Sequence, residues 1–233
     1  MLRARLLHKR FGGHIALRAL DLTVEPGEIY ALLGPNGAGK TTTIQCFLGF
    51  LAPDGGHVTV DGLDPQVDPR GARARLAYIP EQVNLYGHFT GDENLDYFAE
   101  LGGHRYSRKE RTALLEEAGL QAVAFDQRVS GYSKGMRQKV GIAIALAKQA
   151  RALLLDEPTS GLDPSASHEF SQLLGRISQD GVAVLMATHD LFRAREIATR
   201  VGIMRAGQLR REFAPNELSA ANLEQIYLEE MVK

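Results

Sequence analysis

Hydrophobic and polar residues follow two different patterns along this chain, and each pattern predicts one kind of element. Short apolar runs bounded by Gly, Pro and Asp occupy residues 1–85 and return after residue 150. Such runs are typical of buried β-strands. The predicted strands are Leu2–Leu7, Leu20–Val24, Ile29–Leu33, His57–Val60, Leu76–Ile79, Ala152–Leu155, Val182–Ala187 and Val201–Met204.

Helical spacing of apolar residues marks the remaining segments, and residues 86–150 contain no strong strand pattern. Strand–helix alternation on both sides of this all-helical block predicts an α/β fold with a parallel-sheet core and a helical insertion. The predicted helices are Thr41–Phe50, Asn94–Leu101, Arg108–Ala118, Ser133–Ala150, Ser165–Gln179 and Leu191–Thr199.

We expect one domain with three parts. Its catalytic core is residues 1–85 and 151–215, the helical insertion is residues 86–150, and the tail, residues 216–233, is an amphipathic helix. The tail either docks on the chain's own core or contacts a partner, since both would cover its apolar face.

Composition narrows the class of protein. The chain has 233 residues and 44% hydrophobic residues, with 27 Lys and Arg against 28 Asp and Glu. This charge balance argues against a general nucleic-acid binder, which usually carries a surplus of cations. The one cysteine, Cys46, excludes an intramolecular disulfide, fits a reducing compartment, and is expected to be a buried core residue.

No segment resembles a membrane span or a signal peptide. The apolar stretch Val140–Ala147 is far shorter than the ~20 residues needed to cross a bilayer. Cations break every apolar pair among the first ten residues. We therefore expect a soluble, cytoplasmic chain.

A glycine-rich loop carries the first chemical signal. Residues 34–41 match the pattern G-x-x-x-x-G-K-[ST], follow a predicted buried strand and open a predicted helix. In such a loop the backbone N–H groups turn inward, and the helix N-terminus adds positive potential for phosphate. A plain glycine-rich turn is the less favoured alternative. The residues expected to hold a nucleoside triphosphate are Gly34, Pro35, Asn36, Gly37, Ala38, Gly39, Lys40, Thr41 and Thr42.

Polar side chains follow several other predicted strands, where the carboxyl ends of parallel strands meet. We assign Asp156 to Mg²⁺ through water, and Glu157 to polarising the attacking water; either acid could instead merely cap a buried strand. His189 is a candidate γ-phosphate sensor or a structural histidine, and Gln82 is a site residue or surface. The predicted catalytic residues are thus Lys40, Glu157 and His189, and Thr41 and Asp156 are predicted magnesium ligands.

Together these motifs resemble those of the ATP-binding cassette (ABC) ATPases over almost the whole chain. The matching segments, in the family's order, are the phosphate loop, Gln82 (Q-loop), Tyr132–Gln138 (signature), Leu153–Pro158, Ser160–Asp163 (D-loop) and His189 (switch histidine). The resemblance implies a P-loop NTPase fold with an N-terminal antiparallel β subdomain, ATP and Mg²⁺ as ligands, and ATP hydrolysis. It also implies that Gln82 joins Thr41 and Asp156 as a magnesium ligand.

The resemblance also implies a head-to-tail dimer in which each ATP lies between one chain's phosphate loop and the other chain's signature. Ser133 and Gly135 are the signature positions expected to touch the phosphate, although Ser133 could be an ordinary helix N-cap. The chain departs from the commoner Leu-Ser-Gly-Gly-Gln at Tyr132, Lys134 and Met136. Phe11 stands where the family carries an adenine-stacking aromatic, or else packs at a sheet edge.

Finer features resemble the ATPases of bacterial drug, polyketide and sodium exporters, which work with separately encoded permeases. This implies an ATPase at the cytoplasmic face of the inner membrane, contacting an integral membrane permease near Val83–Phe89. The expected partner cassette is a second copy of the same chain, because this chain has every motif of the ATP site. The alternative is a non-transport ABC ATPase that transmits force to a membrane complex. Soluble DNA- or ribosome-acting relatives fit less well, because no basic extension or coiled-coil arm is present.

Overall fold

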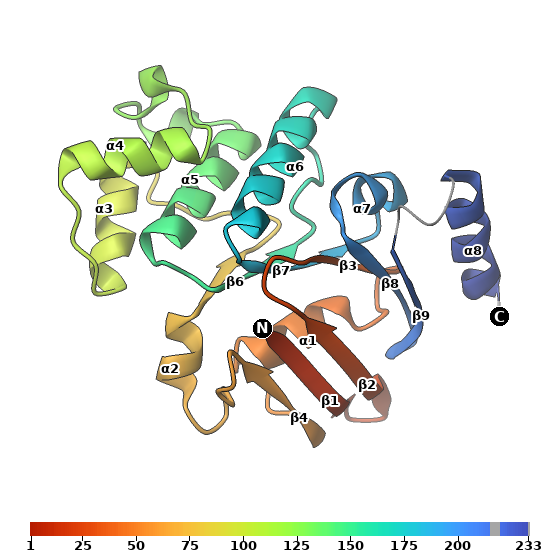
Figure 1. Ribbon diagram of the computed structural model, residues 1–233. Coiled ribbons are helices and arrows are strands. Elements are labelled where there is room, and N and C mark those ends of the chain that lie inside the picture. Colours follow the sequence, from red (N-terminus) through yellow and green to blue (C-terminus); the bar gives the residue numbers. More distant parts are fainter. Residues whose placement is uncertain (215–219, 233) are drawn as a thin grey trace.

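A six-stranded sheet with the order β5-β6-β7-β3-β8-β9 lies at the centre of the computed structural model, which describes residues 1–214 and 220–232 (Figure 1). Neighbouring strands from β5 to β8 run parallel, whereas the edge strand β9 pairs antiparallel with β8. The strands are β3 (Ile29–Leu33), β5 (Leu76–Ile79), β6 (Ala152–Asp156), β7 (Ala183–Thr188), β8 (Arg200–Arg205) and β9 (Gln208–Phe213).

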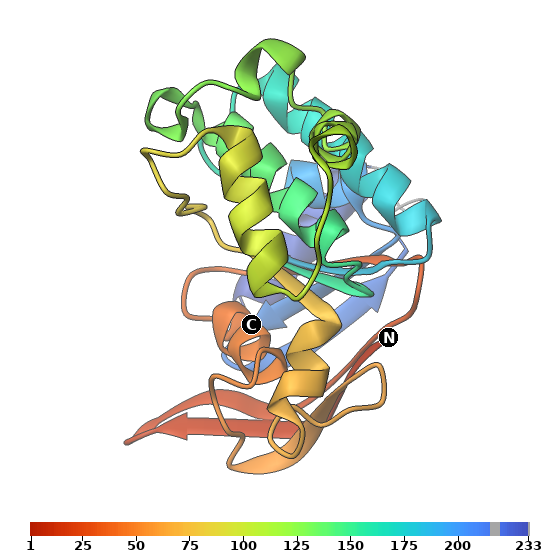
Figure 2. The same ribbon diagram turned by 90° about the vertical axis from the view of Figure 1, so that its left-hand side faces the viewer.

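A second, antiparallel sheet with the order β2-β1-β4 covers one side of this core. Its strands are β1 (Leu2–Phe11), β2 (His14–Val24) and β4 (Gly55–Val60). Figure 2 shows it below the central sheet with α1 (Lys40–Phe47) between the two, and the helices of the middle of the chain on the opposite side. The remaining helices are α2 (Pro69–Ala74), α3 (Gly91–Leu101), α4 (Arg108–Glu117), α5 (Lys134–Ala147), α6 (Pro164–Gln179), α7 (Leu191–Ile197) and α8 (Ala220–Val232).

Strand β3 shows why the sheet has a core on each face. Side chains alternate along a strand, so Ile29, Ala31 and Leu33 pack with α5 and α6, whereas Tyr30 and Leu32 pack with α1 and the antiparallel sheet. Every residue of β3 is buried. The uninterrupted apolar run in the sequence is the pattern of a strand covered on both faces.

Local signals in the sequence set the starts of the central helices. Thr90 and Ser107 each form a capping box, with α3 and α4 respectively. The Asp163 side chain accepts a hydrogen bond from the Ala166 N–H at the start of α6. These caps explain how the chain forms a helical layer over the central sheet.

The structure confirms the predicted α/β fold and the helical character of the middle of the chain, and it corrects several details. Strand β9 and helix α2 were not predicted; β9 makes the central sheet mixed rather than wholly parallel. The predicted helix 41–50 ends at Phe47, because Gly49 adopts a left-handed conformation with φ +71°. The division into core, insertion and tail stays a prediction.

The described part of the tail docks on the chain itself. In α8, Ile226, Tyr227 and Met231 pack against the core layer that contains α5 and α6. The guanidinium of Arg205 donates a hydrogen bond to the Glu230 carbonyl oxygen at 2.7 Å. Residues 216–219 and 233 of the predicted tail lie outside the described residues. Among the described helices, none has the length and apolar character that crossing a bilayer requires.

Candidate functional site

An open cleft of about 350 Å³ lies where β3 turns into α1 and where β6 ends. It brings together residues from distant parts of the sequence, including the first β-hairpin. The lining residues are Phe11, His14, Ala16, Asn36, Gly37, Ala38, Gly39, Lys40, Thr41, Thr42, Glu81, Asp156 and Glu157.

The loop between β3 and α1 needs glycine at two of its positions for steric reasons. At Gly34 a Cβ would overlap the Met204 carbonyl oxygen, and at Gly39 it would lie 2.6 Å from the Ala16 carbonyl oxygen. Gly39 also has φ +108°, a conformation that other residues rarely adopt. It is the N-cap of α1 and has no side chain to bond the first N–H groups of the helix. These donors therefore suit an external anion such as phosphate.

Lys40 folds back over this loop. Its ammonium donates hydrogen bonds to the carbonyl oxygens of Gly34 at 2.7 Å and Pro35 at 3.2 Å. Only 6% of the residue is exposed, and burial lowers the pKa of Lys40 below its usual range. A charge held in this low-dielectric position interacts more strongly with a phosphate than an exposed lysine would.

Asp156 meets the start of α1 from the end of β6. Its Oδ2 accepts a hydrogen bond of 2.9 Å from the Thr41 hydroxyl. Burial raises the pKa of Asp156 above its usual range, with the Thr41 hydrogen bond opposing the shift. A hydroxyl and a carboxylate oxygen side by side are hard oxygen ligands of the kind Mg²⁺ accepts.

Glu157 follows with a strained backbone. Its φ of +48° lies in the left-handed region, which costs a residue with a side chain roughly 1–2 kcal/mol. Its N–H bonds the Ala187 carbonyl at 2.9 Å, and its Oε2 accepts from the Thr188 hydroxyl at 3.2 Å. Strain held in place by such contacts is typical of functional positions.

His189 lies against the same carboxylate. Its Nδ1 is 2.9 Å from Glu157 Oε1, which is also 3.8 Å from the Lys40 ammonium. The His189 side chain is 58% exposed, so its ring remains open to a ligand. The predicted catalytic residues Lys40, Glu157 and His189 therefore form one contiguous group.

Three predicted site residues lie elsewhere. Gln82 is exposed and does not line the cleft, where its neighbour Glu81 takes that place. Ser133 caps α5, its hydroxyl accepting a hydrogen bond from the Met136 N–H at 3.2 Å. A Cβ on Gly135 would contact Leu162 and Ala166 near the start of α6, not the cleft. Within one chain, the signature and phosphate loop are not brought together.

Sequence reasoning missed Glu81 and His14 as cleft residues. Glu81 follows β5 directly after Pro80, so an acidic residue at a strand end was the available signal. His14 begins β2 after the turn that follows Phe11, and no sequence signal pointed to it.

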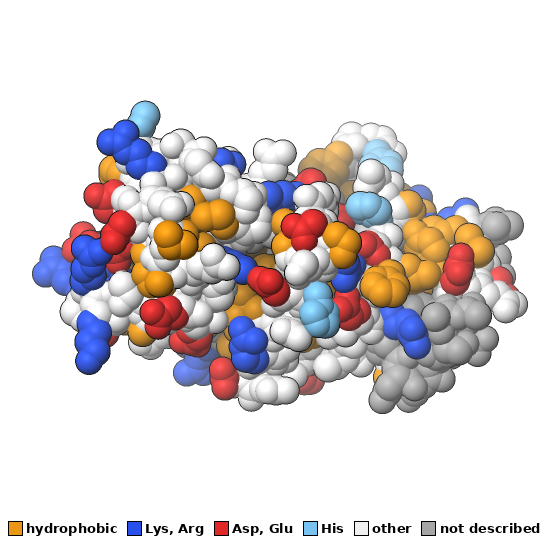
Figure 3. Space-filling view, turned by 90° about the horizontal axis from the view of Figure 1, so that it is seen from above, with side chains coloured by type: hydrophobic (Ala, Val, Ile, Leu, Met, Phe, Trp, Pro, Cys, Tyr) orange, Lys and Arg blue, Asp and Glu red, His pale blue; other side chains and the backbone are white. Residues whose placement is uncertain are grey.

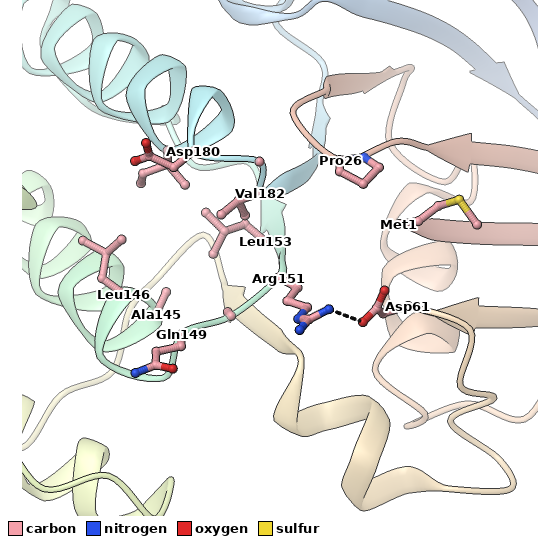
Figure 4. A pocket seen from close by; sticks show the side chains of 13 residues that line it. Met1, Pro26, Asp61, Ala145, Leu146, Gln149, Arg151, Leu153, Asp180 and Val182 are labelled. Carbon is pink, nitrogen blue, oxygen red and sulfur yellow. Dashed lines mark hydrogen bonds and ion pairs between the residues drawn. The ribbon is translucent and has the colours of Figure 1, made fainter.

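A larger cavity of about 450 Å³ opens at the opposite end of the sheet, near the starts of β6 and β7 (Figure 4). Its walls are mainly apolar, and the Arg151 guanidinium lies 3.1 Å from Asp61 Oδ2 at its edge. None of the predicted site residues lines it. The predicted catalytic residues therefore lie at the smaller, more polar cleft.

Comparison with known proteins now decides the family. The family described as ABC transporter matches residues 17–160, more than half of the chain. The chain belongs to the ABC transporter family. This confirms the family predicted from the motifs, and with it an ABC transporter ATPase that binds ATP.

Individual relatives of this ABC protein place it more closely. It is 38% identical to the uncharacterized ABC transporter ATP-binding protein YdbJ of Bacillus subtilis (strain 168), over 89% of this chain and 67% of YdbJ. It is also 38% identical to a Nod factor export ATP-binding protein I of Burkholderia lata, over 92% of this chain and 71% of that protein. It spans only 39% of the length of YbhF of Escherichia coli (strain K12), a probable multidrug ABC transporter ATP-binding protein.

Solved structures confirm the cassette fold. The dimeric ATP-binding cassette MJ0796, in a post-hydrolysis state bound to ADP and Pi, matches with a TM-score of 0.80 at 27% identity. The match covers 92% of this chain and 99% of that one. The chain thus shares its fold with a cassette that forms dimers.

Proposed function

We propose that this ABC ATPase works as a dimer of identical chains that closes on ATP and drives export through a separately encoded membrane permease. The observation that carries the proposal is a divided site. Lys40, Asp156 and Glu157 are already in place around one cleft, whereas Ser133 and Gly135 lie outside it. A second chain could supply the missing signature.

The cleft residues take distinct roles in phosphoryl transfer. Lys40, released from the Gly34 carbonyl, places its ammonium on the β- and γ-phosphates. Glu157 polarises the attacking water, and His189, which contacts this carboxylate, senses the γ-phosphate. Positioning and charge neutralisation dominate this type of reaction.

Thr41 and Asp156 hold Mg²⁺ in this proposal. When bound, the ion neutralises negative charge on the transferring phosphate. Mg²⁺ usually keeps several waters and needs few protein ligands, so these two oxygens fit it. Among the described residues there is no cluster of three or more His, Cys, Asp or Glu that could hold a metal. The predicted contribution of Gln82 stays a prediction, because its side chain is exposed outside the cleft.

An aromatic cluster supports the predicted permease contact at Val83–Phe89. Tyr86 lies 5.3 Å from Phe89 and 5.0 Å from Tyr97 between ring centroids. Tyr86 is 48% exposed, although its backbone is fixed by hydrogen bonds with the buried Asn94 side chain. Exposed aromatic groups on a fixed scaffold are typical of protein interfaces. We assign this surface to a cytoplasmic segment of the permease, which places the ATPase at the inner face of the membrane.

Export is favoured by the kind of relatives that the chain matches. Besides the Nod factor export protein, they include the daunorubicin resistance ATP-binding protein DrrA2 of Streptomyces coeruleorubidus, 37% identical over 93% of this chain. The near balance of 27 Lys and Arg against 28 Asp and Glu disfavours a nucleic-acid partner, and the face shown in Figure 3 mixes basic and acidic side chains. The competing function is a non-transport ABC ATPase acting on a membrane complex.

Co-purification tests the proposal. The Glu157→Gln chain, tagged and extracted from native membranes in mild detergent with ATP and Mg²⁺, should recover a multi-span integral protein in near-equal amount. A matched variant that also carries Tyr86→Asp and Phe89→Asp should lose that protein while still binding ATP. A membrane complex without a multi-span transport protein would favour the non-transport function. Absence from membranes would contradict both.

A further inference from the structure

Lys134 connects three segments around the cleft. Its ammonium donates a 2.6 Å hydrogen bond to the Ser160 carbonyl oxygen and lies 3.8 Å from Glu81 Oε1. The Ser160 hydroxyl donates to the same Glu81 oxygen at 3.0 Å. One side chain at the start of α5 thus holds the segments that follow β5 and β6.

A second contact from α5 strengthens this connection. The buried Gln138, one helical turn after Lys134, donates from Nε2 to the Pro158 carbonyl oxygen. Residues four apart lie on the same helix face, so both side chains reach the same segment. The start of α5 therefore holds residues 158–160 at two points.

These residues belong to the turn that carries Glu157. The Ser160 N–H bonds the Glu157 carbonyl oxygen at 3.1 Å, which closes a tight turn directly after the strained residue. A shift of Ser160 would therefore displace the Glu157 backbone. At the α5 end of this contact, Lys134 lies in the sequence between Ser133 and Gly135, the two signature residues.

We propose that Lys134 is a positioning residue for ATP hydrolysis, coupling the signature at the start of α5 to the turn that holds Glu157 in the same chain. The inference rests on the proposed function, in which Ser133 and Gly135 contact the ATP bound by the partner chain. Closure of one site would then be transmitted through Lys134 to the catalytic carboxylate of the other. A glycine, which the commoner motif has at this position, can make neither side-chain contact.

The positive charge of Lys134 strengthens these contacts, because its side chain is only 29% exposed and its ammonium lies against the Ser160 carbonyl and the Glu81 carboxylate. Hydrogen bonds that involve a charged group are stronger than neutral ones. Removing the ammonium while keeping the apolar stem should therefore loosen the turn without emptying the space.

The test compares steady-state ATP hydrolysis by four variants of the full chain. Lys134→Met should lower kcat about tenfold and leave KM for ATP within about twofold, because one charge-assisted hydrogen bond is lost away from the nucleotide. Lys134→Arg should recover most of the activity by keeping a charged donor. Lys139→Met is the matched control: this lysine is on the same helix and pairs with Glu169 at 2.8 Å, but makes no contact with the turn.

The fourth variant separates this inference from the proposed function. If Glu157→Gln abolishes turnover while Lys134→Met keeps wild-type kcat, the positioning role is wrong and the proposed function stands. If Glu157→Gln keeps full turnover, the proposed function fails. Equal losses in Lys134→Met and Lys139→Met, or a parallel rise in KM, would show a merely structural role and overturn the inference.

Discussion

The phosphate cleft and the start of α5 contain the two halves of the predicted ATP site, and they are built differently. In the cleft, Lys40 and His189 both lie within contact distance of Glu157, and the carbonyl groups of the loop hold the lysine. At the start of α5, Ser133 bonds only its own helix turn, and Gly135 faces α6.

This difference separates what one chain can do from what needs two. Partial charges in the cleft are arranged before any ligand arrives, so a single chain is equipped to bind nucleotide. Ser133 and Gly135 have no access to that nucleotide in the same chain, which predicts that binding and turnover can be separated by mutation.

We expect the largest effect, a loss of turnover, from a substitution of Glu157 in the phosphate cleft. Glu157→Gln should reduce kcat by about 10²- to 10⁴-fold, because general-base assistance to the attacking water is lost. Nucleotide affinity should stay within a few-fold of wild type, since the amide keeps the shape of the side chain. Phosphate release and nucleotide titration measure the two quantities. Unchanged ATPase activity would remove Glu157 from the reaction.

A substitution at the start of α5 should lower turnover and leave nucleotide binding by the single chain unchanged. Gly135→Asp places a carboxylate where the partner's phosphate is expected, and kcat should fall by about 10²-fold, the usual cost of losing charge stabilisation in a transition state. Binding of ADP by the single chain should not change, because Gly135 lies outside the cleft. If binding falls as much as turnover, the division between the halves is wrong.

A mixture of the two inactive variants, Glu157→Gln and Gly135→Asp, tests whether the two halves of one site come from different chains. A mixed dimer of Glu157→Gln and Gly135→Asp chains has one site with both defects and one with none. An equal mixture should recover activity above that of either variant alone, up to about a quarter of the wild-type rate, since half of the dimers are mixed and each has one intact site. Recovery requires the head-to-tail arrangement, and its absence would contradict the proposed homodimer.

Lys40→Ala should have the opposite profile to Gly135→Asp. Losing a charged donor to the β- and γ-phosphates should weaken ATP binding by about 10- to 100-fold. The change also removes the ammonium that the Gly34 and Pro35 carbonyl groups hold, so Lys40→Met is a useful second variant that keeps the stem. Tight ATP binding by either variant, measured by titration without Mg²⁺, would contradict the role of Lys40.

The sequence predicted the central strands well because their apolar runs reflect burial on both faces. It missed β9, where Arg210, Arg211 and Glu212 interrupt the apolar pattern. That strand is held instead by pairing with β8 and by the buried Tyr30 hydroxyl, which donates to Glu212 at 2.8 Å. Long-range contacts of this kind leave no local pattern. Cys46 is fully buried as predicted, and burial raises the pKa of its thiol to about 11.

For the site, the sequence predicted residues that belong to a motif or stand at a strand end, and missed others that loops bring to the cleft. Lys40 was predicted from the glycine-rich loop pattern, and Asp156 and Glu157 were predicted because they stand at the end of β6. Glu81 lines the cleft where Gln82 was expected, since the direction of the chain after Pro80 is a tertiary property. Lys134 was noted only as a departure from the commoner motif; its contact with Ser160, 26 residues further along the chain, has no sequence signature.

The smallest predicted effect concerns Phe11, which borders the cleft from the end of β1 and is 46% exposed. The Lys9 ammonium lies 5.5 Å from its ring centroid, which leaves one ring face for an adenine. Phe11→Ala should weaken ADP binding by about three- to tenfold, the typical contribution of aromatic stacking, with kcat nearly unchanged. Phe50→Ala is the control, because Phe50 is also exposed but lies beyond the other end of α1. Equal affinity of the Phe11→Ala and Phe50→Ala variants would show that the ring only packs at the sheet edge. A loss of ADP affinity in Phe11→Ala alone would show that the cleft of a single chain binds the adenine base as well as the phosphates.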